Sequence, residues 1–584
     1  MPTQIRVIAN CDDAVVFWGI DAPIKDCFGF SVERERAVSG QQVHREVLEN
    51  RMGFARDKPQ SGDHKPSNIW PFQRFWWADH AVNSGDKVRY RVTPMVFANG
   101  ALVEQLQGRS PWTPWTVLSG DAGDGIAAFF NRGLVISQFM ARYLEDLRVR
   151  EGLDTREDAL KAFKKSLDEH ELPIRKFLSG ALRDRMLELL QDAVTKKRDV
   201  YAALYELEDD ELVGALKKLK SRGHIVLANG SITAKKGEGV ENARKRDQNK
   251  QARADLRKAG VEVLDRFISP GALGHNKFLV VANGKKPLAA WTGSTNWTKT
   301  GLCTQINNGL LVEHAAFADE YMQQWKRLKD AKSTFPAKLV DDNSKPKKLK
   351  VGKSRAEIWF TRAAQKVDLA ALESVVIGAK EGVLFLMFQP GSAGTLGVIN
   401  KMLKKPAGRY IKGVVSTLPP DAVDTEDEAT VSVHDTGTKS EVSFDVVQPT
   451  GINHAFSSWA ATVTRNEFLF GEGKIGFAIV HSKLIVVDPF TKPVVITGSH
   501  NFSTTASTKN DENFVIIRDN EELACEYGAH ILSVYHHYSW MAYVNQQQKQ
   551  KKNPKANLEE SDAWQARALR GPAKRELDFW LKGS

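Results

Sequence analysis

Cysteine, long apolar runs and a leader-like start are scarce or absent in this sequence. Its 584 residues include four cysteines, Cys11, Cys27, Cys303 and Cys525. They are too few and too scattered for a disulfide framework or a zinc site, so we expect free thiols in a reducing compartment. No stretch reaches the roughly 18 apolar residues of a membrane span. Residues 1–20 alternate like a strand, so we expect no secretory signal, no transmembrane segment and a cytoplasmic location.

Positive charge is in excess. The formal net charge is +11 and the isoelectric point lies near 9.2. This favours anionic partners such as nucleic acid, phospholipid headgroups or other phosphate esters. A basic surface without a specific ligand would give the same net charge. A hydrophobic content of 42% and a charged content of 26% are ordinary for a globular protein, and the length allows about two to four domains.

Residues 1–118 predict a small all-β domain. Short β-rich segments are separated by Gly, Asp, Asn and Pro, with no long helical pattern between them, which favours one β-sandwich. The expected strands are 5–9, 14–18, 29–33, 87–92 and 112–118. The segment VRYRVTPM (88–95) resembles a late strand of fibronectin type III domains. Such a sandwich could bind a protein partner. The aromatic run 70–80 is expected in its core or at a domain contact, with ligand binding as the alternative.

Strands and helices alternate after residue 118, and the alternation occurs twice. We expect a first α/β half at 119–335 with a helical insertion near 151–198, a linker at 336–353, and a second half at 354–545. Alternation of this kind predicts mainly parallel or mixed sheets with helices on both faces. One long helix is expected at 243–260. The stretch 546–584 is expected to be a solvated basic tail with a docking tip, and a short amphipathic helix at 568–584 is the alternative.

A short motif is duplicated, once in each half. The first copy, GHNKFLVVANG, contains His275 and Lys277, and the second, VHSKLIVVDPF, contains His481 and Lys483. Each is followed by a small-polar turn, GSTNW at 293–297 and GSHNF at 498–502. Side chains two positions apart on a strand point to the same face. The duplicated His-Lys-Asn set therefore predicts two half-sites that meet around one phosphate.

Phosphodiester hydrolysis needs an attacking group, an acid for the leaving oxygen, and positive charge around the non-bridging oxygens. No carboxylate cluster with metal-ligand spacing lies near the motifs, so we expect no metal and no cofactor. Two lysines and two amides can supply the positive charge instead. Two histidines can serve as nucleophile and general acid.

Over residues 120–540 the motifs HNK…GSTNW…QINN and HSK…GSHNF…NDEN resemble the phospholipase D superfamily. The resemblance implies two pseudo-symmetric α/β/α sandwich halves and a metal-independent phosphodiesterase that works through a phosphohistidine. The catalytic residues that it implies are His275, Lys277, Asn296, His481, Lys483, Asn501 and Glu512. Ser294 and Ser499 are expected to bind substrate, or to be ordinary turn residues, and Asp488 is expected to be structural. Family precedent favours His275 as the nucleophile, and the sequence leaves the choice open.

The two halves are not equal. Ala282 stands where Asp488 stands in the second half, and Asn307 stands where Glu512 stands. A carboxylate can hold the second ring nitrogen of a histidine and fix its tautomer, so Glu512 is expected to mark the half whose histidine needs orientation. Asn308 and Asn513 are expected to cap turns.

Three functions fit these features. The first is a nuclease, slightly favoured by the net charge and by a basic helix. The basic residues of that helix are Arg244, Lys245, Arg246, Lys250, Arg253, Arg257 and Lys258. The second is a phospholipase D that acts on phospholipid headgroups. The third is an inactive scaffold whose β-sandwich binds a partner. Two halves suffice for one site per chain, so dimerisation is not required.

Overall fold

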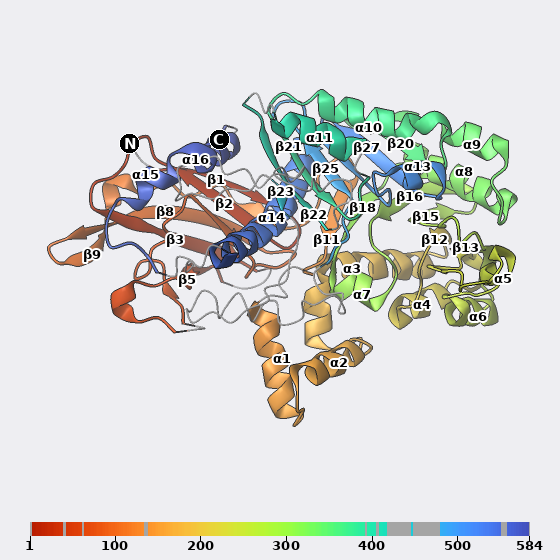
Figure 1. The fold of residues 1–584 in the computed structure, drawn as a ribbon, viewed down its shortest axis with the longest axis horizontal. Coiled ribbons are helices and arrows are strands. Elements are labelled where there is room, and N and C mark those ends of the chain that lie inside the picture. The colour runs from red at the N-terminus through yellow and green to blue at the C-terminus, as the bar shows by residue number, and fades with distance from the viewer. Residues whose placement is uncertain are drawn as a thin grey trace.

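The structure is a computed structural model, and it describes residues 3–38, 42–60, 63–133, 138–391, 394–404, 408–416, 446–447, 479–549 and 557–582. Figure 1 shows an all-β unit at one end of the molecule and two α/β units at the other. The long helix α14 (Glu521–Lys549) runs between them. This is the predicted fold class, an α/β protein with a duplicated half and a preceding all-β domain.

The N-terminal unit is a β-sandwich of two antiparallel sheets. The three-stranded sheet contains β1 (Gln4–Ala9), β2 (Ala14–Gly19) and β7 (Trp76–Asp79). The five-stranded sheet contains β10 (Thr116–Val117), β8 (Lys87–Ala98), β3 (Cys27–Ala37), β4 (His44–Val47) and β9 (Ala101–Glu104). A small pair, β5 (Glu49–Asn50) and β6 (Lys65–Pro66), lies apart from both sheets. From the aromatic run, Phe72 and Phe75 lie in the sandwich core. The likeness to fibronectin type III domains stays a prediction.

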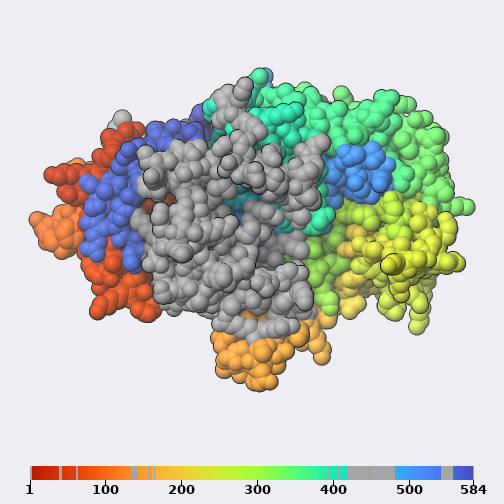
Figure 2. Space-filling model, viewed as in Figure 1, coloured from red at the N-terminus to blue at the C-terminus, as the bar shows by residue number. Residues whose placement is uncertain are grey.

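The C-terminal segment completes this sandwich. Within 557–582, α15 (Trp564–Ala568) and α16 (Gly571–Leu581) pack on it, and Figure 2 shows the dark-blue C-terminal residues beside the red N-terminal ones. Trp564 is buried in the sandwich core and donates to the Cys27 carbonyl at 2.9 Å. Trp580 stacks on Phe17 at 5.3 Å. The predicted solvated tail is therefore wrong for 557–582, because the aromatic side chains of this segment are buried despite its basic residues. The alternative, a short helix near the end of the chain, is confirmed by α16. Residues 550–556 lie outside the described part.

The first α/β half is built on a seven-stranded mixed sheet. In spatial order its strands are β11 (Ile126–Phe130), β18 (Asn308–Val312), β16 (Lys286–Gly293), β15 (Lys277–Asn283), β12 (Asp199–Leu204), β13 (Gly223–Ala228) and β14 (Glu262–Arg266). Its helices are α1 (Gln138–Arg150), α2 (Arg156–Ser166), α3 (Pro173–Thr195), α4 (Asp210–Lys217), α5 (Val240–Arg244), α6 (Lys250–Lys258), α7 (Lys299–Cys303) and α8 (Ala315–Ala331). Only β12, β13 and β14 are mutually parallel. The helix α2 of the predicted insertion and the preceding α1 project from the body (Figure 1).

The second half repeats that strand order. Its sheet runs β19 (Lys347–Val351), β20 (Ser354–Phe360), β27 (Asn513–Arg518), β26 (Val494–Gly498), β25 (Leu484–Val487), β21 (Gly382–Met387), β22 (Tyr410–Val415) and β23 (Val446–Val447). Its helices before α14 are α9 (Ala337–Asn343), α10 (Val367–Ile377), α11 (Thr395–Lys404) and α13 (Thr504–Thr508). In spatial order, the seven strands that start with β20 and end with β23 correspond one by one to the seven strands of the first sheet, which start with β11 and end with β14. The duplication therefore extends to the order of the described strands in the two sheets.

Two local predictions differ from the structure. The stretch 336–353, expected as a linker, contains α9 and β19, and β19 pairs with β20 to form the edge of the second sheet. Its apolar positions are alternately buried, a pattern that its many lysines obscure. The helix expected at 243–260 is divided into α5 and α6. Asp247 and Asn249 lie between the two helices. The Asp247 carboxylate accepts a hydrogen bond from the Arg253 side chain.

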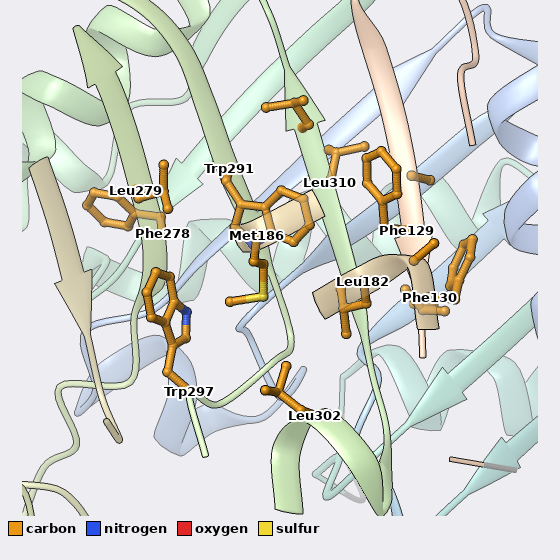
Figure 3. Close-up of a cluster of buried hydrophobic side chains, with 14 of the residues drawn as sticks. Phe129, Phe130, Leu182, Met186, Phe278, Leu279, Trp291, Trp297, Leu302 and Leu310 are labelled. Carbon is orange, nitrogen blue, oxygen red and sulfur yellow. The ribbon is translucent and has the colours of Figure 1, made fainter. Parts of the chain in front are cut away.

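The strands of both sheets are apolar almost throughout because helices cover them. One buried cluster extends from the first half through strands of the second and into α14. Figure 3 shows part of it, where Met186 of α3 lies beside Trp291 of the first sheet. Covering both faces of a sheet gives the continuous apolar runs that the sequence shows at each HxK motif. Each HxK motif lies at the start of its strand, β15 or β25.

Candidate active site

A short parallel pair of strands joins the two halves at the site. β17 (Gln305–Ile306) of the first half pairs with β24 (Ile479–Val480) of the second. The chain continues from β24 directly into His481, whose backbone N–H donates to the Ile306 carbonyl at 3.0 Å. The QIN segment of the first half therefore sets the position of the second histidine.

Pseudo-symmetric asparagines also cross the boundary. Asn308 of the first half donates to the Thr497 hydroxyl at 2.7 Å and to Tyr527 at 3.2 Å in the second. Asn513 of the second half accepts from Thr292 at 2.6 Å and from Tyr321 at 3.2 Å in the first. The prediction that Asn308 and Asn513 cap turns is therefore wrong. Their side chains are fully buried, where an unpaired amide would be costly, so the pairings fix the two halves in register.

Each histidine is held by a residue of the opposite half. The ring nitrogen Nδ1 of His275 lies 3.3 Å from Glu512 Oε1, an ion-pair contact without the alignment of a full hydrogen bond. Nδ1 of His481 lies 2.9 Å from Asn307 Oδ1. Both histidines are only 4% exposed. The arrangement is symmetric in position and asymmetric in charge, with a carboxylate on one ring and a neutral amide on the other.

The lysines lie beside their histidines. Lys277 Nζ donates to the His275 carbonyl at 2.8 Å, and Lys483 Nζ donates to the His481 carbonyl at 2.5 Å. Both ammonium groups are almost fully buried. Within the described residues no carboxylate forms an ion pair of 4 Å or less with either lysine. Two such cations in one place favour an anionic ligand.

Two aromatic rings beneath these pairs were missed by the sequence analysis. Tyr205 lies 4.8 Å from the His275 ring and 4.9 Å from Lys277 Nζ. Phe388 lies 4.7 Å from the His481 ring and 4.8 Å from Lys483 Nζ. Each directly follows the equivalent strand of its repeat, β12 or β21. An aromatic residue at that equivalent position of both repeats was the available signal. The rings orient the imidazoles and partly compensate the buried cations.

Burial is the main cause of the pKa shifts in the site. It lowers the pKa of Lys277 to about 7, with Glu512 and Glu206 acting in the opposite direction. Burial and Lys277 lower the pKa of His275 to about 4. Burial and the neighbouring lysines lower the pKa of His481 well below its usual value. Burial alone would raise the pKa of Glu512, but the facing His275 brings it down to about 2. A bound phosphate anion would reverse the losses of positive charge.

The amides and hydroxyls of the GSxN turns have distinct partners. Asn296 Nδ2 donates to Glu206 Oε2 at 2.7 Å, whereas the Asn501 backbone N–H donates to Glu512. The Ser294 hydroxyl donates to Asn307 Oδ1 at 2.8 Å, so it braces the partner of His481. The Ser499 hydroxyl accepts from the backbone N–H of the residue after Glu512 at 3.1 Å. Substrate contact by these serines is a proposal beyond these contacts.

The glycines of the two turns permit this close approach. A Cβ on Gly293 would lie 2.3 Å from the Asn308 carbonyl oxygen, and one on Gly498 would lie 2.3 Å from the Asn513 carbonyl oxygen. Neither distance is possible for a side chain. The GS dipeptide therefore lets each turn pack against the strand that carries the partner of a histidine.

Asp488 lies away from the histidines. Its carboxylate accepts the backbone N–H groups of Lys380 at 2.8 Å, Glu381 at 2.7 Å and Gly382 at 3.0 Å, at the start of β21. The first half has Ala282 at this place and lacks the contact. The carboxylate thus anchors the strand that carries Phe388.

Asp488→Ala is expected to destabilise the protein by about 2 kcal/mol, because three backbone donors lose their acceptor. Thermal melting of the full chain measures this as a fall in melting temperature. Asp578→Ala, which removes an exposed ion pair with Lys574, is the control and should change little. An Asp488 variant as stable as that control would contradict the anchoring role.

Several arginines of the basic segment predicted to bind nucleic acid are paired with the protein's own carboxylates. Arg253 contacts Asp247 and Asp265, each at 2.7 Å, and is buried. Arg257 also contacts Asp265, and Arg246 pairs with Glu238 at 2.6 Å. The carboxylates come from the preceding turn and the next strand. This segment therefore gives weaker support to a nucleic-acid function than its sequence suggested.

The described residues contain neither a metal-site cluster nor a membrane-spanning helix. No group of three or more His, Cys, Asp or Glu side chains in them is arranged to hold a metal ion. Among the helices of the same residues, none has the length and apolar character that crossing a bilayer demands.

The fold and the site define a duplicated α/β protein whose halves each contribute a His-Lys pair to one centre. The sequence model of the family described as "Cardiolipin synthase, PLD-like domain" matches residues 186–329 and 424–534. The chain therefore carries a phospholipase D-like domain in two parts, and the resemblance to the phospholipase D superfamily is confirmed. No curated protein matches the chain.

Several solved structures share fold features with the chain at low similarity. Phosphatidylserine synthase from Haemophilus influenzae matches with a TM-score of 0.40 and 11% identity, covering 62% of this chain and 87% of that one. Polyphosphate kinase from Porphyromonas gingivalis matches with a TM-score of 0.35 and 13% identity. The match covers 59% of this chain and 46% of the kinase. The phospholipase D family member Nuc from Salmonella typhimurium matches with a TM-score of 0.19 and 18% identity. The match covers 32% of this chain and 96% of Nuc. At these values no activity is transferred from any of them.

Proposed function

We propose that the protein is a metal-independent phosphodiesterase that works through a phosphohistidine. The observation that carries the proposal is the crossed pairing of His275 with Glu512 and of His481 with Asn307. Because Nδ1 of each ring faces its partner, the chemistry at phosphorus falls to Nε2 of each ring. Lys277, Lys483, Asn296 and Asn501 are proposed to bind the non-bridging oxygens, with Ser294 and Ser499 in support.

In the first step His275 is the nucleophile. Its Nε2 lone pair forms the bond to phosphorus, and the bond from phosphorus to the leaving oxygen breaks. The leaving oxygen takes the proton of His481 Nε2. The imidazole ring becomes cationic on phosphorylation, and the carboxylate of Glu512 beside Nδ1 stabilises that charge. Asn307 offers His481 no such charge, which is why we assign the nucleophile to His275.

In the second step water completes the reaction. His481, now neutral, takes a proton from a water molecule whose oxygen attacks phosphorus. The bond from phosphorus to His275 Nε2 breaks, and the histidine returns to its first state. His481 must be protonated at the start of each cycle. Burial and the two lysines lower its pKa, and the bound phosphate anion is proposed to offset them.

Nucleic acid is the substrate that we slightly prefer, on the net charge of +11 and the repeating anionic backbone that such a charge suits. A phospholipid headgroup is the alternative. The third reading, an inactive scaffold with a partner-binding sandwich, is disfavoured by the completeness of both His-Lys-Asn sets. We also propose a cytoplasmic location, one site per chain, and domain boundaries at residues 118 and 335.

A substrate panel tests this function. Single- and double-stranded DNA, RNA and phosphatidylcholine vesicles are each incubated with the protein in the presence of a chelator. We expect turnover of a nucleic acid, undiminished by the chelator, with binding that weakens steeply as salt rises. Turnover of vesicles alone would identify a phospholipase instead. Activity that disappears with the chelator would contradict the metal-independent mechanism.

A further inference from the structure

One half of the site contains a carboxylate that the other half lacks. Glu206 follows Tyr205 at the end of β12, and its Oε2 lies 2.7 Å from Asn296 Nδ2. The equivalent position after β21 and Phe388 is Gln389. A carboxylate beside a group proposed to bind an anion conflicts with that role. The sequence motifs give no reason for it.

The conflict lies in which end of the Asn296 amide faces the site. An ionised carboxylate can only accept hydrogen bonds, so Nδ2 must face Glu206. The other end, Oδ1, is then buried without a partner. It is an acceptor, and it would repel a phosphoryl oxygen. The oxygen and nitrogen of such an amide exchange places by a half-turn, according to the hydrogen bonds on offer.

Protonation of Glu206 removes the conflict. A carboxylic acid donates one hydrogen bond, and the Asn296 oxygen can accept it after the half-turn. Nδ2 then faces away from Glu206 and can donate to a phosphoryl oxygen. Asn501 needs no such arrangement, since within the described residues no carboxylate oxygen lies within hydrogen-bond distance of its side-chain amide.

We propose that Glu206 is a positioning residue whose protonation sets the Asn296 amide to donate to the phosphoryl group, so that anion binding is lost when Glu206 ionises. The inference rests on the proposed function, because it assumes that Asn296 faces phosphate. It adds a pH dependence to the first half-site that the second half-site does not share.

The surroundings of Glu206 raise its pKa above the ordinary value of a glutamate. Burial raises its pKa, Lys277 of β15 opposes that rise, and Glu208 adds to it. Gln248 donates to Glu208 at 2.8 Å and lies 3.5 Å from Glu206. The Tyr205 hydroxyl, whose pKa is raised mainly by burial, is a further titratable neighbour. Below its pKa Glu206 is protonated, so phosphate binding is strong at low pH and is lost as the pH rises through that value.

Glu206→Gln separates this proposal from simple loss of charge on Lys277. The amide of glutamine can donate to Asn296 at every pH, so the variant should keep phosphate affinity to higher pH than the wild type. Removing the carboxylate also lowers the pKa of Lys277, since Glu206 raises it. If Lys277 alone governed binding, the same variant would lose affinity at lower pH. The two explanations predict shifts of opposite sign.

The experiment measures binding of inorganic phosphate to the full chain by calorimetry, from about pH 5 to about pH 9. At the alkaline end we expect Glu206→Gln to bind about tenfold more tightly than the wild type. Glu208→Gln, a matched change that does not contact Asn296, removes a charge that raises the pKa of Glu206, so it should move the loss of binding to lower pH, opposite to Glu206→Gln. Melting temperatures confirm folding. If the glutamine variant does not fold, Glu206→Ala, which frees the amide to turn, should also keep affinity at high pH.

An unchanged midpoint in Glu206→Gln, or one moved to lower pH, overturns this inference and leaves the histidine chemistry intact. Absence of phosphate binding by the wild type at every pH overturns the proposed function as well. In kinetics with a substrate, the variant should lower KM at alkaline pH and leave kcat unchanged, whereas a disturbed fold would lower kcat at all pH values.

Discussion

Replacing His275 by alanine is expected to lower kcat/KM by at least about 10³-fold, because the covalent route to the product is lost. His481→Ala should lower turnover to a similar extent, since neither the leaving group nor the water then has its proton partner. Combining the two changes should cost little more than either alone, because the histidines act as one unit. Steady-state kinetics on the preferred substrate measure all three variants.

His44, exposed on β4 of the sandwich, is the matched control, and His44→Ala should retain wild-type activity. Full activity in both His275→Ala and His481→Ala would exclude the enzyme function at this site and favour the scaffold alternative. A loss confined to one variant would show that the chemistry uses a single histidine.

Replacing Glu512 by glutamine is expected to lower kcat by roughly 10²–10³-fold. Glutamine has nearly the same shape, but it cannot carry the charge that stabilises the phosphorylated His275 ring. The pKa of Glu512 is about 2, so the wild-type side chain is ionised at all ordinary pH values. The loss in the variant should therefore be independent of pH above about pH 4. Pre-steady-state kinetics should place the loss in formation of the intermediate.

Asn307→Ala is the matched change on the other ring, and it should cost less, about tenfold, because it removes a neutral partner of His481. Equal losses in the two variants would contradict the assignment of His275 as nucleophile. The same carboxylate contributes to stability. Its folded-state pKa is depressed, so that contribution is present above about pH 4, the ordinary pKa of glutamate, and is lost as the pH falls toward about 2.

The sequence was informative about the site where the chemistry repeats. An HxK on a strand places both side chains on one face whatever the rest of the fold does, so the duplicated motif indicated the residues of the centre. The crossed partners could not be derived in the same way. They depend on the pairing of β17 with β24, two strands of two residues each that no periodicity reveals. The difference between Asn307 and Glu512 was visible in the sequence, but the histidine that each of them contacts was not.

Isolated residues and charge runs were less informative. Tyr205 and Phe388 are single aromatic residues at strand ends. A single aromatic residue forms no sequence pattern that would mark it as part of a site. Arg253 belongs to a basic run in sequence, but Asp247 and Asp265 neutralise it in three dimensions. In the C-terminal segment Trp564 and Trp580 outweigh their basic surroundings by packing into the sandwich and beside α14. Composition describes exposure poorly where a few aromatic side chains decide the packing.

Trapping the phosphorylated enzyme and locating the phosphoryl group tests the central claim most directly. The His481→Ala variant is mixed with a substrate whose leaving group needs no proton, and the reaction is stopped with base, in which phosphohistidine survives. Mass spectrometry of the digested protein then locates the adduct. We expect the phosphoryl group on the peptide that contains His275, and none on the peptide that contains Lys483. A covalent adduct on any other residue, or turnover without an adduct, would contradict the account.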